Sequence, residues 1–143
     1  MKAIAGKSNG ALPDLSPVLQ RRVTVLGSTG SIGVSTLDVI AHARKAYGAD
    51  AMPVEALTAQ ANVELLAKQA REIKPKIAVI GDPALHAQLK SALAGTGIET
   101  AAGREAVVAA GARPSEFVMV AIVGAAAIEP ALEAIRRGAV VAL

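Results

Sequence analysis

A chain of 143 residues can form one domain with a buried core and hardly two. It is 52% hydrophobic but only 1% aromatic, and its net charge of +3 is not gathered into basic blocks, so neither base stacking nor a general affinity for nucleic acid is indicated. The absence of cysteine excludes disulfides and zinc–thiolate sites, and no apolar run reaches the roughly 18 residues of a membrane span, so we expect a cytoplasmic protein without nucleic-acid or membrane partners.

The first 20 residues hold two glycines and two prolines among polar residues and show no hydrophobic period. Such a stretch is typical of a mobile leader, which we place at residues 1–20. The folded domain is then expected over residues 21–143. Arg22, at the start of the first strand, is expected to be a solvated surface charge.

A short apolar strand, residues 23–26, leads into the turn Gly27-Ser-Thr-Gly-Ser-Ile-Gly33, and a helical pattern runs from Ser31 to Tyr47. This order is typical of a site that binds the pyrophosphate of a dinucleotide. Gly27 is expected to make the sharp exit from the strand, Gly30 to let the backbone approach a phosphate, and Gly33 to bring the helix close to the strand.

The start of this helix is the expected anion site. Backbone N–H groups near Ser31 and Ile32 would have no partner within the helix and could donate to a phosphate, aided by the helix dipole. The hydroxyls of Ser28, Thr29 and Ser31 are expected to add donors. A plain strand–turn–helix connection can show the same glycine spacing, so the motif alone does not decide the function.

Strand and helix patterns alternate along the rest of the chain. Further strands are expected at 53–58, 77–80, 98–101, 117–123 and 139–143, and helices at 63–73, 83–93, 104–110 and 130–137. The alternation predicts an α/β, Rossmann-like fold: a doubly wound parallel sheet with helices on both faces, for which we take the common strand order 3-2-1-4-5-6. Because the last apolar pattern has no helix after it, we expect the chain to be cut short before a catalytic domain.

The loop after the second strand bears on the choice of cofactor. NAD-binding domains carry a carboxylate where this strand ends; Thr58-Ala59-Gln60 has none, and Glu55 lies too early, within the strand. The loop therefore favours NADP, whose 2′-phosphate could be bound by the amides of Gln60 and Asn62 and by the helix start at Asn62. Asn62 could equally be a plain helix cap, and the loop has no Lys or Arg for the phosphate.

The turn at 120–126 leaves a buried strand with small residues, which would leave room for a nicotinamide ring, although simple helix–sheet packing explains its alanines equally well. The histidines His42 and His86 are expected to have surface or packing roles. The carboxylates considered are expected to be helix-face or cap residues rather than a metal site: Asp38, Asp82 and Glu129.

The turn Gly27–Gly33 with its continuation Ser-Thr-Leu-Asp-Val-Ile at 35–40 closely resembles the 1-deoxy-D-xylulose 5-phosphate reductoisomerase family. The segment 121–126, with Pro130 and Gly138 after it, adds to the resemblance, which covers about residues 22–143. It implies an NADPH-dependent oxidoreductase of non-mevalonate isoprenoid biosynthesis. Such an enzyme rearranges 1-deoxy-D-xylulose 5-phosphate and reduces it to 2-C-methyl-D-erythritol 4-phosphate, uses Mg²⁺ or Mn²⁺, and is typically a homodimer.

Carried over by position, the resemblance implies that the glycine turn binds the NADPH phosphates and that the loop 59–62 binds the adenosine 2′-phosphate. The loop departs from the family, which commonly has a glycine and a basic residue where Gln60 and Ala61 stand. The candidate cofactor-binding residues are Gly27, Thr29, Gly30, Ser31, Ile32, Ala59, Gln60 and Asn62.

No catalytic residue or metal ligand is expected within this chain. In the family the Asn-Lys-Glu segment, the metal-binding carboxylates and the mobile lid should come after the position of Leu143, so the chain alone is expected to bind NADPH without catalysing the reaction. Two alternatives stay open on the sequence: an NADP-dependent reductase of the aspartate-semialdehyde dehydrogenase type, and a non-catalytic nucleotide- or CoA-binding module.

Overall fold

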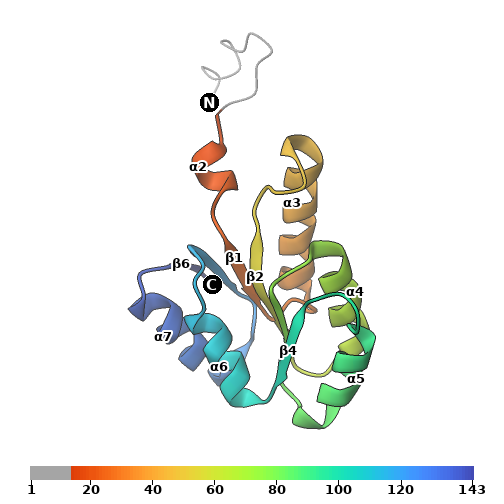
Figure 1. Cartoon of the computed structure of the whole chain (residues 1–143). Helices are drawn as coiled ribbons and strands as arrows, with labels where there is room; N and C mark the ends of the chain where they lie inside the picture. Colours follow the sequence, from red (N-terminus) through yellow and green to blue (C-terminus); the bar gives the residue numbers. More distant parts are fainter. Residues whose placement is uncertain (1–13) are drawn as a thin grey trace.

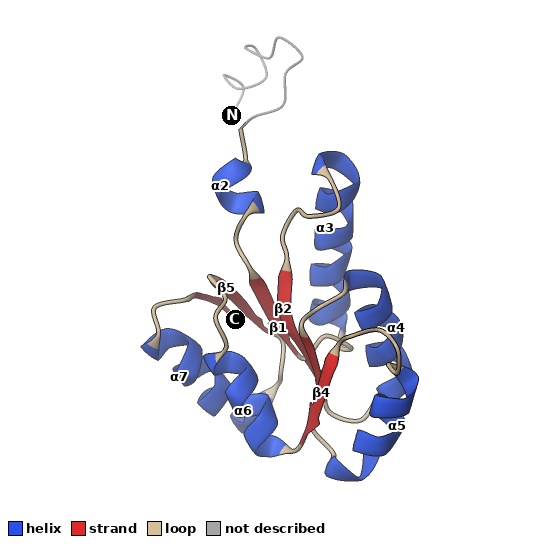
Figure 2. Ribbon diagram, viewed as in Figure 1, coloured by secondary structure: helices blue, strands red, loops and turns tan. Residues whose placement is uncertain are grey.

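The computed structural model describes residues 14–143, which form a parallel six-stranded sheet with helices on both faces (Figures 1 and 2). The strands are β1 (Val23–Leu26), β2 (Val54–Ala59), β3 (Ile77–Ile80), β4 (Glu99–Ala102), β5 (Phe117–Val120) and β6 (Val140–Ala142). The helices are α2 (Ser16–Leu19), α3 (Ser31–Tyr47), α4 (Val63–Ile73), α5 (His86–Ala92), α6 (Arg104–Ala112) and α7 (Ile128–Arg136), with 3₁₀ turns η1 (Pro83–Leu85) and η2 (Gly124–Ala127). The expected α/β, Rossmann-like fold is confirmed.

The strand order is β4-β3-β2-β1-β5-β6, so the expected order 3-2-1-4-5-6 is wrong. The chain makes three successive crossovers toward one edge of the sheet, and only then does α6 return it to β5, beside β1. The short strand β4 pairs with β3 at that edge. Local apolar patterns identify each strand, but they do not show on which side of the sheet a crossover places the next one.

Each face of the sheet has its own core. On one face, Leu37 and Ile40 of α3 pack with Leu66 of α4 against Val25 and other strand residues. On the other face the helices contribute mainly alanine, and Leu26 and Val118 pack against Ala110, Ala131 and Ala134. Because β1 is buried on both faces, it reads as a continuous apolar run rather than an alternating one.

Helices α6 and α7 lie in close contact. A Cβ added to Gly111 of α6 would lie 2.2 Å from the carbonyl oxygen of Pro130 in α7. Arg137, directly after α7, donates from its guanidinium to the carbonyl oxygens of Gly111 and Ser115 and to the Ser115 hydroxyl. Burial of the guanidinium lowers the pKa of Arg137 below its usual value, and the charges of nearby glutamates offset only part of this shift. These contacts fix the two helices relative to each other.

The expected mobile leader lies mostly outside the described residues, which begin at 14. From there the chain forms α2, and just before this helix Asp14 Oδ1 accepts from the Ser16 N–H at 3.0 Å. The Met52 N–H donates to the carbonyl oxygen of Leu19 at 2.7 Å, which joins this segment to the loop before β2. A domain boundary at residue 20 stays a prediction.

Glu55 is a buried carboxylate near the amino end of β2. Its Oε1 accepts from Arg22 Nη1 at 3.1 Å and its Oε2 accepts from Arg113 Nε at 2.8 Å. Arg22 precedes β1 and Arg113 follows α6, so this carboxylate joins three parts of the chain. The expectation that Arg22 is a solvated surface charge is therefore wrong, because its guanidinium pairs with the buried Glu55. The two residues lie 33 positions apart, so no local pattern in the sequence indicates their contact.

Replacing Glu55 by Gln should lower the free energy of unfolding by about 2 kcal/mol. The substitution keeps the side-chain size but removes the only ion-pair partner that Arg22 has within residues 14–143 and leaves Arg113 with the exposed Glu99, 3.7 Å away. The partial exposure of both arginines keeps the loss below the roughly 3–5 kcal/mol of a fully buried pair. Urea unfolding followed by circular dichroism measures the difference. The control is Glu133→Gln, which breaks a more exposed pair with Arg136 and should cost at most about 0.5 kcal/mol. Equal losses in the two variants would contradict the role given to Glu55.

Candidate functional site

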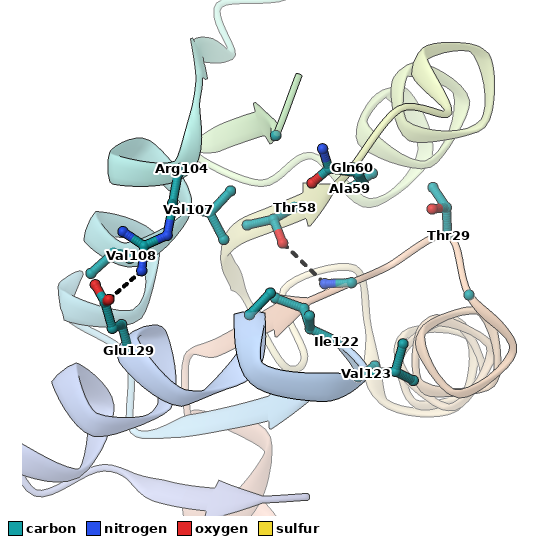
Figure 3. A pocket seen from close by; sticks show the side chains of 15 residues that line it. Thr29, Thr58, Ala59, Gln60, Arg104, Val107, Val108, Ile122, Val123 and Glu129 are labelled. Carbon is teal, nitrogen blue, oxygen red and sulfur yellow. Dashed lines mark hydrogen bonds and ion pairs between the residues drawn. The ribbon is translucent and has the colours of Figure 1, made fainter. Parts of the chain in front are cut away.

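A cleft of about 500 Å³ lies at the carboxyl ends of the strands (Figure 3). It is lined by the glycine turn after β1, the ends of β2 and β3, the first turns of α6, and the segment after β5. Strands β1 and β5 are neighbours, but the chain leaves them in opposite directions, toward β2 and β6. In open α/β sheets ligands bind at such a point of divergence, and the volume is typical of a small-molecule site.

The geometry of the glycine turn confirms the roles expected for Gly27 and Gly33. Gly27 has a φ of +87°, and its added Cβ would lie 2.9 Å from the carbonyl carbon of Ala121 on the neighbouring strand's exit. A Cβ on Gly33 would lie 2.2 Å from the carbonyl oxygen of Gly27, so α3 starts in contact with the turn. Thr58 holds the turn from the side of β2, because its carbonyl oxygen accepts from the N–H groups of Gly27 and Ser28.

Gly30 differs from these two glycines. The nearest atom to its added Cβ is the Gly27 carbonyl oxygen at 4.0 Å, so the space beside Gly30 is open. It caps α3 with extended backbone, and its carbonyl oxygen accepts the first helical bond from the Val34 N–H at 2.9 Å. Among residues 14–143, no carbonyl or side chain accepts a hydrogen bond from the N–H groups of Ser31 and Ile32. This end of the cleft can therefore receive an anion.

Ser28 does not contribute the expected hydroxyl donor to the cleft. Its side chain is buried, and its Oγ donates to Gln69 Oε1 at 2.7 Å, while Gln69 Nε2 donates back to the Ser28 carbonyl oxygen at 2.9 Å. The turn directs Ser28 inward against α4, so the serine and the buried glutamine satisfy each other. The expectation for Ser28 is wrong, and its hydroxyl instead helps to hold the turn.

The loop after β2 lies against the end of β3. The Gln60 side chain occupies the space that a side chain at Gly81 would need, since a Cβ there would lie 2.2 Å from Gln60 Oε1. The Asn62 side chain accepts from the Leu65 N–H at 3.1 Å and so caps α4. This confirms the helix-cap role, one of the two roles expected for Asn62. The absence of a side chain at residue 81 thus makes room for Gln60 at the edge of the cleft.

The structure brings most of the candidate residues together. Those that line the cleft are Gly27, Thr29, Gly30, Ala59 and Gln60. Ser31 and Ile32 are exposed at the start of α3, next to Gly30. Asn62 lies two residues after Gln60, at the start of α4. The segment at 121–126 also lines the cleft, through Ala121, Ile122, Val123 and Ala126.

Helices α6 and α7 form a wall of the cleft that no pattern in the sequence indicates. Arg104, Val107 and Val108 of α6 line the cleft, and so does Glu129 of α7, which we expected to be a helix-face or cap residue. The Arg104 guanidinium forms an ion pair with the Glu129 carboxylate (Figure 3). The two residues lie on different helices, so no local spacing in the sequence indicates their contact.

The histidines lie away from the cleft lining. His42 Nδ1 lies 2.7 Å from the Asp38 carbonyl oxygen on α3, and His86 Nε2 lies 3.2 Å from Thr100 Oγ1. Between residues 14 and 143, no group of three or more His, Cys, Asp or Glu side chains could hold a metal ion. None of the helices in the same range is long and apolar enough to cross a membrane.

Comparisons with known proteins point to one family. The family model for 1-deoxy-D-xylulose 5-phosphate reductoisomerase matches residues 23–143. Curated 1-deoxy-D-xylulose 5-phosphate reductoisomerases include that of Rhodospirillum centenum, 56% identical over 122 residues, and that of Gluconobacter oxydans, 52% identical over 124 residues. The alignments cover 85% and 87% of this chain but only 29% of each relative. The chain thus spans about three-tenths of the length of these relatives.

Solved structures of the same family share the fold. The reductoisomerase of Zymomonas mobilis in complex with NADPH matches with a TM-score of 0.81 at 48% identity, over 87% of this chain and 32% of that chain. A DOX-P reductoisomerase in complex with NADPH, fosmidomycin and magnesium matches with a TM-score of 0.76 at 29% identity, over 86% and 29%.

Alanine at Gly33 should destabilise the fold, whereas alanine at Gly30 should leave its stability nearly unchanged. Gly33→Ala places a methyl group against the Gly27 carbonyl oxygen and should lower the free energy of unfolding by about 2 kcal/mol or more, as overpacking does. Gly30→Ala meets open space and should leave stability within about 0.5 kcal/mol. Thermal and urea unfolding of both variants test this difference. A stable Gly33→Ala variant would show that the turn and α3 are not in the contact described.

Proposed function

Because the chain belongs to the 1-deoxy-D-xylulose 5-phosphate reductoisomerase family, we propose that it is the NADPH-binding part of such an enzyme. The proposed reaction of the longer protein is the rearrangement of 1-deoxy-D-xylulose 5-phosphate and its reduction to 2-C-methyl-D-erythritol 4-phosphate, in non-mevalonate isoprenoid biosynthesis. Since the chain spans about three-tenths of its relatives, binding of the cofactor is assigned to residues 21–143 and catalysis to the longer protein.

The observation that carries this proposal is the start of α3. The N–H groups of Ser31 and Ile32 have no acceptor within residues 14–143, and beside them Gly30 leaves open space at the cleft. A diphosphate can approach the backbone there, where the helix dipole and the free donors both favour negative charge. The residues present therefore fit the cofactor, and Gly27, Thr29, Gly30, Ser31 and Ile32 are the proposed phosphate-binding residues.

The two ends of the dinucleotide are assigned on either side of this point. The adenosine lies toward β2 and β3, where Ala59, Gln60 and Asn62 are the proposed contacts and where no carboxylate lies among Thr58, Ala59 and Gln60 to repel a 2′-phosphate. The nicotinamide lies toward the small residues of 121–126. NADPH supplies the hydride when bound, and the chain's own residues bind and orient it.

Other properties of the proposed enzyme depend on the family alone. They are a divalent metal, Mg²⁺ or Mn²⁺, a homodimeric assembly, a phosphorylated substrate and a cytoplasmic location. Residues 14–143 contain no group of side chains able to hold a metal ion, so we assign the metal ligands to another part of the longer protein. A relative's structure does contain magnesium together with NADPH and fosmidomycin.

Titration of the 143-residue chain with NADPH, NADH and CoA tests the assignment of the cofactor. NADPH should bind about tenfold more tightly than NADH, because only NADPH carries the 2′-phosphate that charge-assisted hydrogen bonds would stabilise. Nicotinamide fluorescence and calorimetry report the dissociation constants. Gly30→Ala should weaken NADPH binding because its methyl group takes the space of a phosphate, whereas Ser35→Ala, at an exposed position later in α3, should not. Binding of CoA alone would end the proposal.

The chain by itself should not turn over 1-deoxy-D-xylulose 5-phosphate. The cleft supplies cofactor contacts, but residues 14–143 supply no metal-ligand group for the substrate's rearrangement. The loss of NADPH absorbance in the presence of Mg²⁺ and substrate is the measurement, with the full-length Gluconobacter oxydans reductoisomerase as the active control. Turnover by the purified 143-residue chain would contradict this expectation.

A further inference from the structure

Arg104 is the only positively charged side chain among the described residues that line the cleft. It is the first residue of α6, and 72% of its side chain is exposed to solvent. Its partner Glu129 is 52% exposed. An ion pair this exposed contributes little to stability, so Arg104 can exchange its carboxylate for another anion at small cost.

Contacts along the sheet edge place Arg104 close to the loop after β2. The Gly103 N–H donates to the carbonyl oxygen of Ile80 at 2.9 Å, so the start of α6 is fixed to the end of β3. The next residue, Gly81, is the one over which the Gln60 side chain lies. Strands β2, β3 and β4 are neighbours about 4.8 Å apart, so the loops after β2 and β4 lie about 10 Å apart. A long arginine side chain and a phosphate group can together bridge that gap.

The loop after β2 lacks the charge that a phosphate needs. Neither Gln60 nor Ala61 is basic, and the carboxylate of Asp82, beyond Gly81, is directed to the Ala84 N–H, from which it accepts at 3.0 Å. Arginine is the side chain best suited to a phosphate, because its planar guanidinium presents two parallel N–H donors. The missing positive charge is therefore available from α6 rather than from the loop itself.

We propose that Arg104 is the residue that selects the 2′-phosphate: it leaves Glu129 and binds the adenosine 2′-phosphate of NADPH opposite Gln60. This inference rests on the proposed binding of NADPH. Glu129 then acts as a competing internal anion that holds Arg104 when no dinucleotide is bound. Discrimination between NADPH and NADH thus comes from a helix that follows β4, and the loop after β2 contributes polar contacts without charge.

The test compares Arg104→Gln with Arg136→Gln in the 143-residue chain. Arg136 is also about 70% exposed and also pairs with a glutamate, Glu133, but it does not line the cleft, so the control removes the same charge elsewhere. Dissociation constants for NADPH and NADH are measured by nicotinamide fluorescence, and circular dichroism checks folding. Arg104→Gln should weaken NADPH binding about tenfold and leave NADH binding unchanged, because only the contact to the 2′-phosphate is lost. Arg136→Gln should change neither.

Glu129→Gln provides the reciprocal measurement. Because it removes the carboxylate that competes for Arg104, it should strengthen NADPH binding about threefold without affecting NADH. An Arg104→Gln variant that keeps the wild-type ratio of the two dissociation constants would overturn the assignment of Arg104 and leave the proposed function standing. That outcome includes equal weakening for both nucleotides, in which case Arg104 would contact a part that they share. A wild-type chain that binds neither nucleotide would overturn both proposals.

Discussion

The contact between Gly33 and the carbonyl oxygen of Gly27 determines where α3 begins, and much of the site depends on it. With no Cβ between them, the helix starts directly against the end of β1, and its first N–H groups come to lie beside the cleft instead of above the sheet. The carbonyl oxygen of Thr58 fixes the other side of the same turn by accepting two N–H groups. Backbone contacts alone thus place the proposed phosphate site, a helix start whose first N–H groups are unpaired within the described chain, at the junction of β1, β2 and β5.

The amino ends and the carboxyl ends of the strands differ in how their charged and polar groups are paired. At the amino ends, the buried Glu55 carboxylate accepts hydrogen bonds from Arg22 and Arg113, and these ion pairs join distant parts of the chain. At the carboxyl ends polar groups are available: within residues 14–143 the N–H groups of Ser31 and Ile32 have no acceptor, and Arg104 pairs with an exposed carboxylate. The fold is thus stabilised by charges at the amino ends, while the proposed cofactor site lies at the carboxyl ends of the same strands.

Local sequence signals predicted what local geometry decides. The limits of α3, the parallel strands and the roles of Gly27 and Gly33 could be predicted, because glycine spacing and apolar periodicity act over a few residues. The strand order could not, because it depends on which side each crossover returns. Nor could the pairs Ser28–Gln69 and Arg104–Glu129, since each joins elements that only the folded sheet brings together.

The close approach at Gly111 has a consequence for the opposite end of α6. Arg104 lies seven residues before Gly111, about 10 Å along the helix axis, while Glu129 is adjacent to Pro130, which Gly111 touches. The contact therefore holds α6 against α7 near one end of α6, and the guanidinium of Arg104 lies at the other end. A side chain at residue 111 would force α6 away from α7, so we expect the proposed nucleotide preference to respond to a substitution that lies outside the cleft lining.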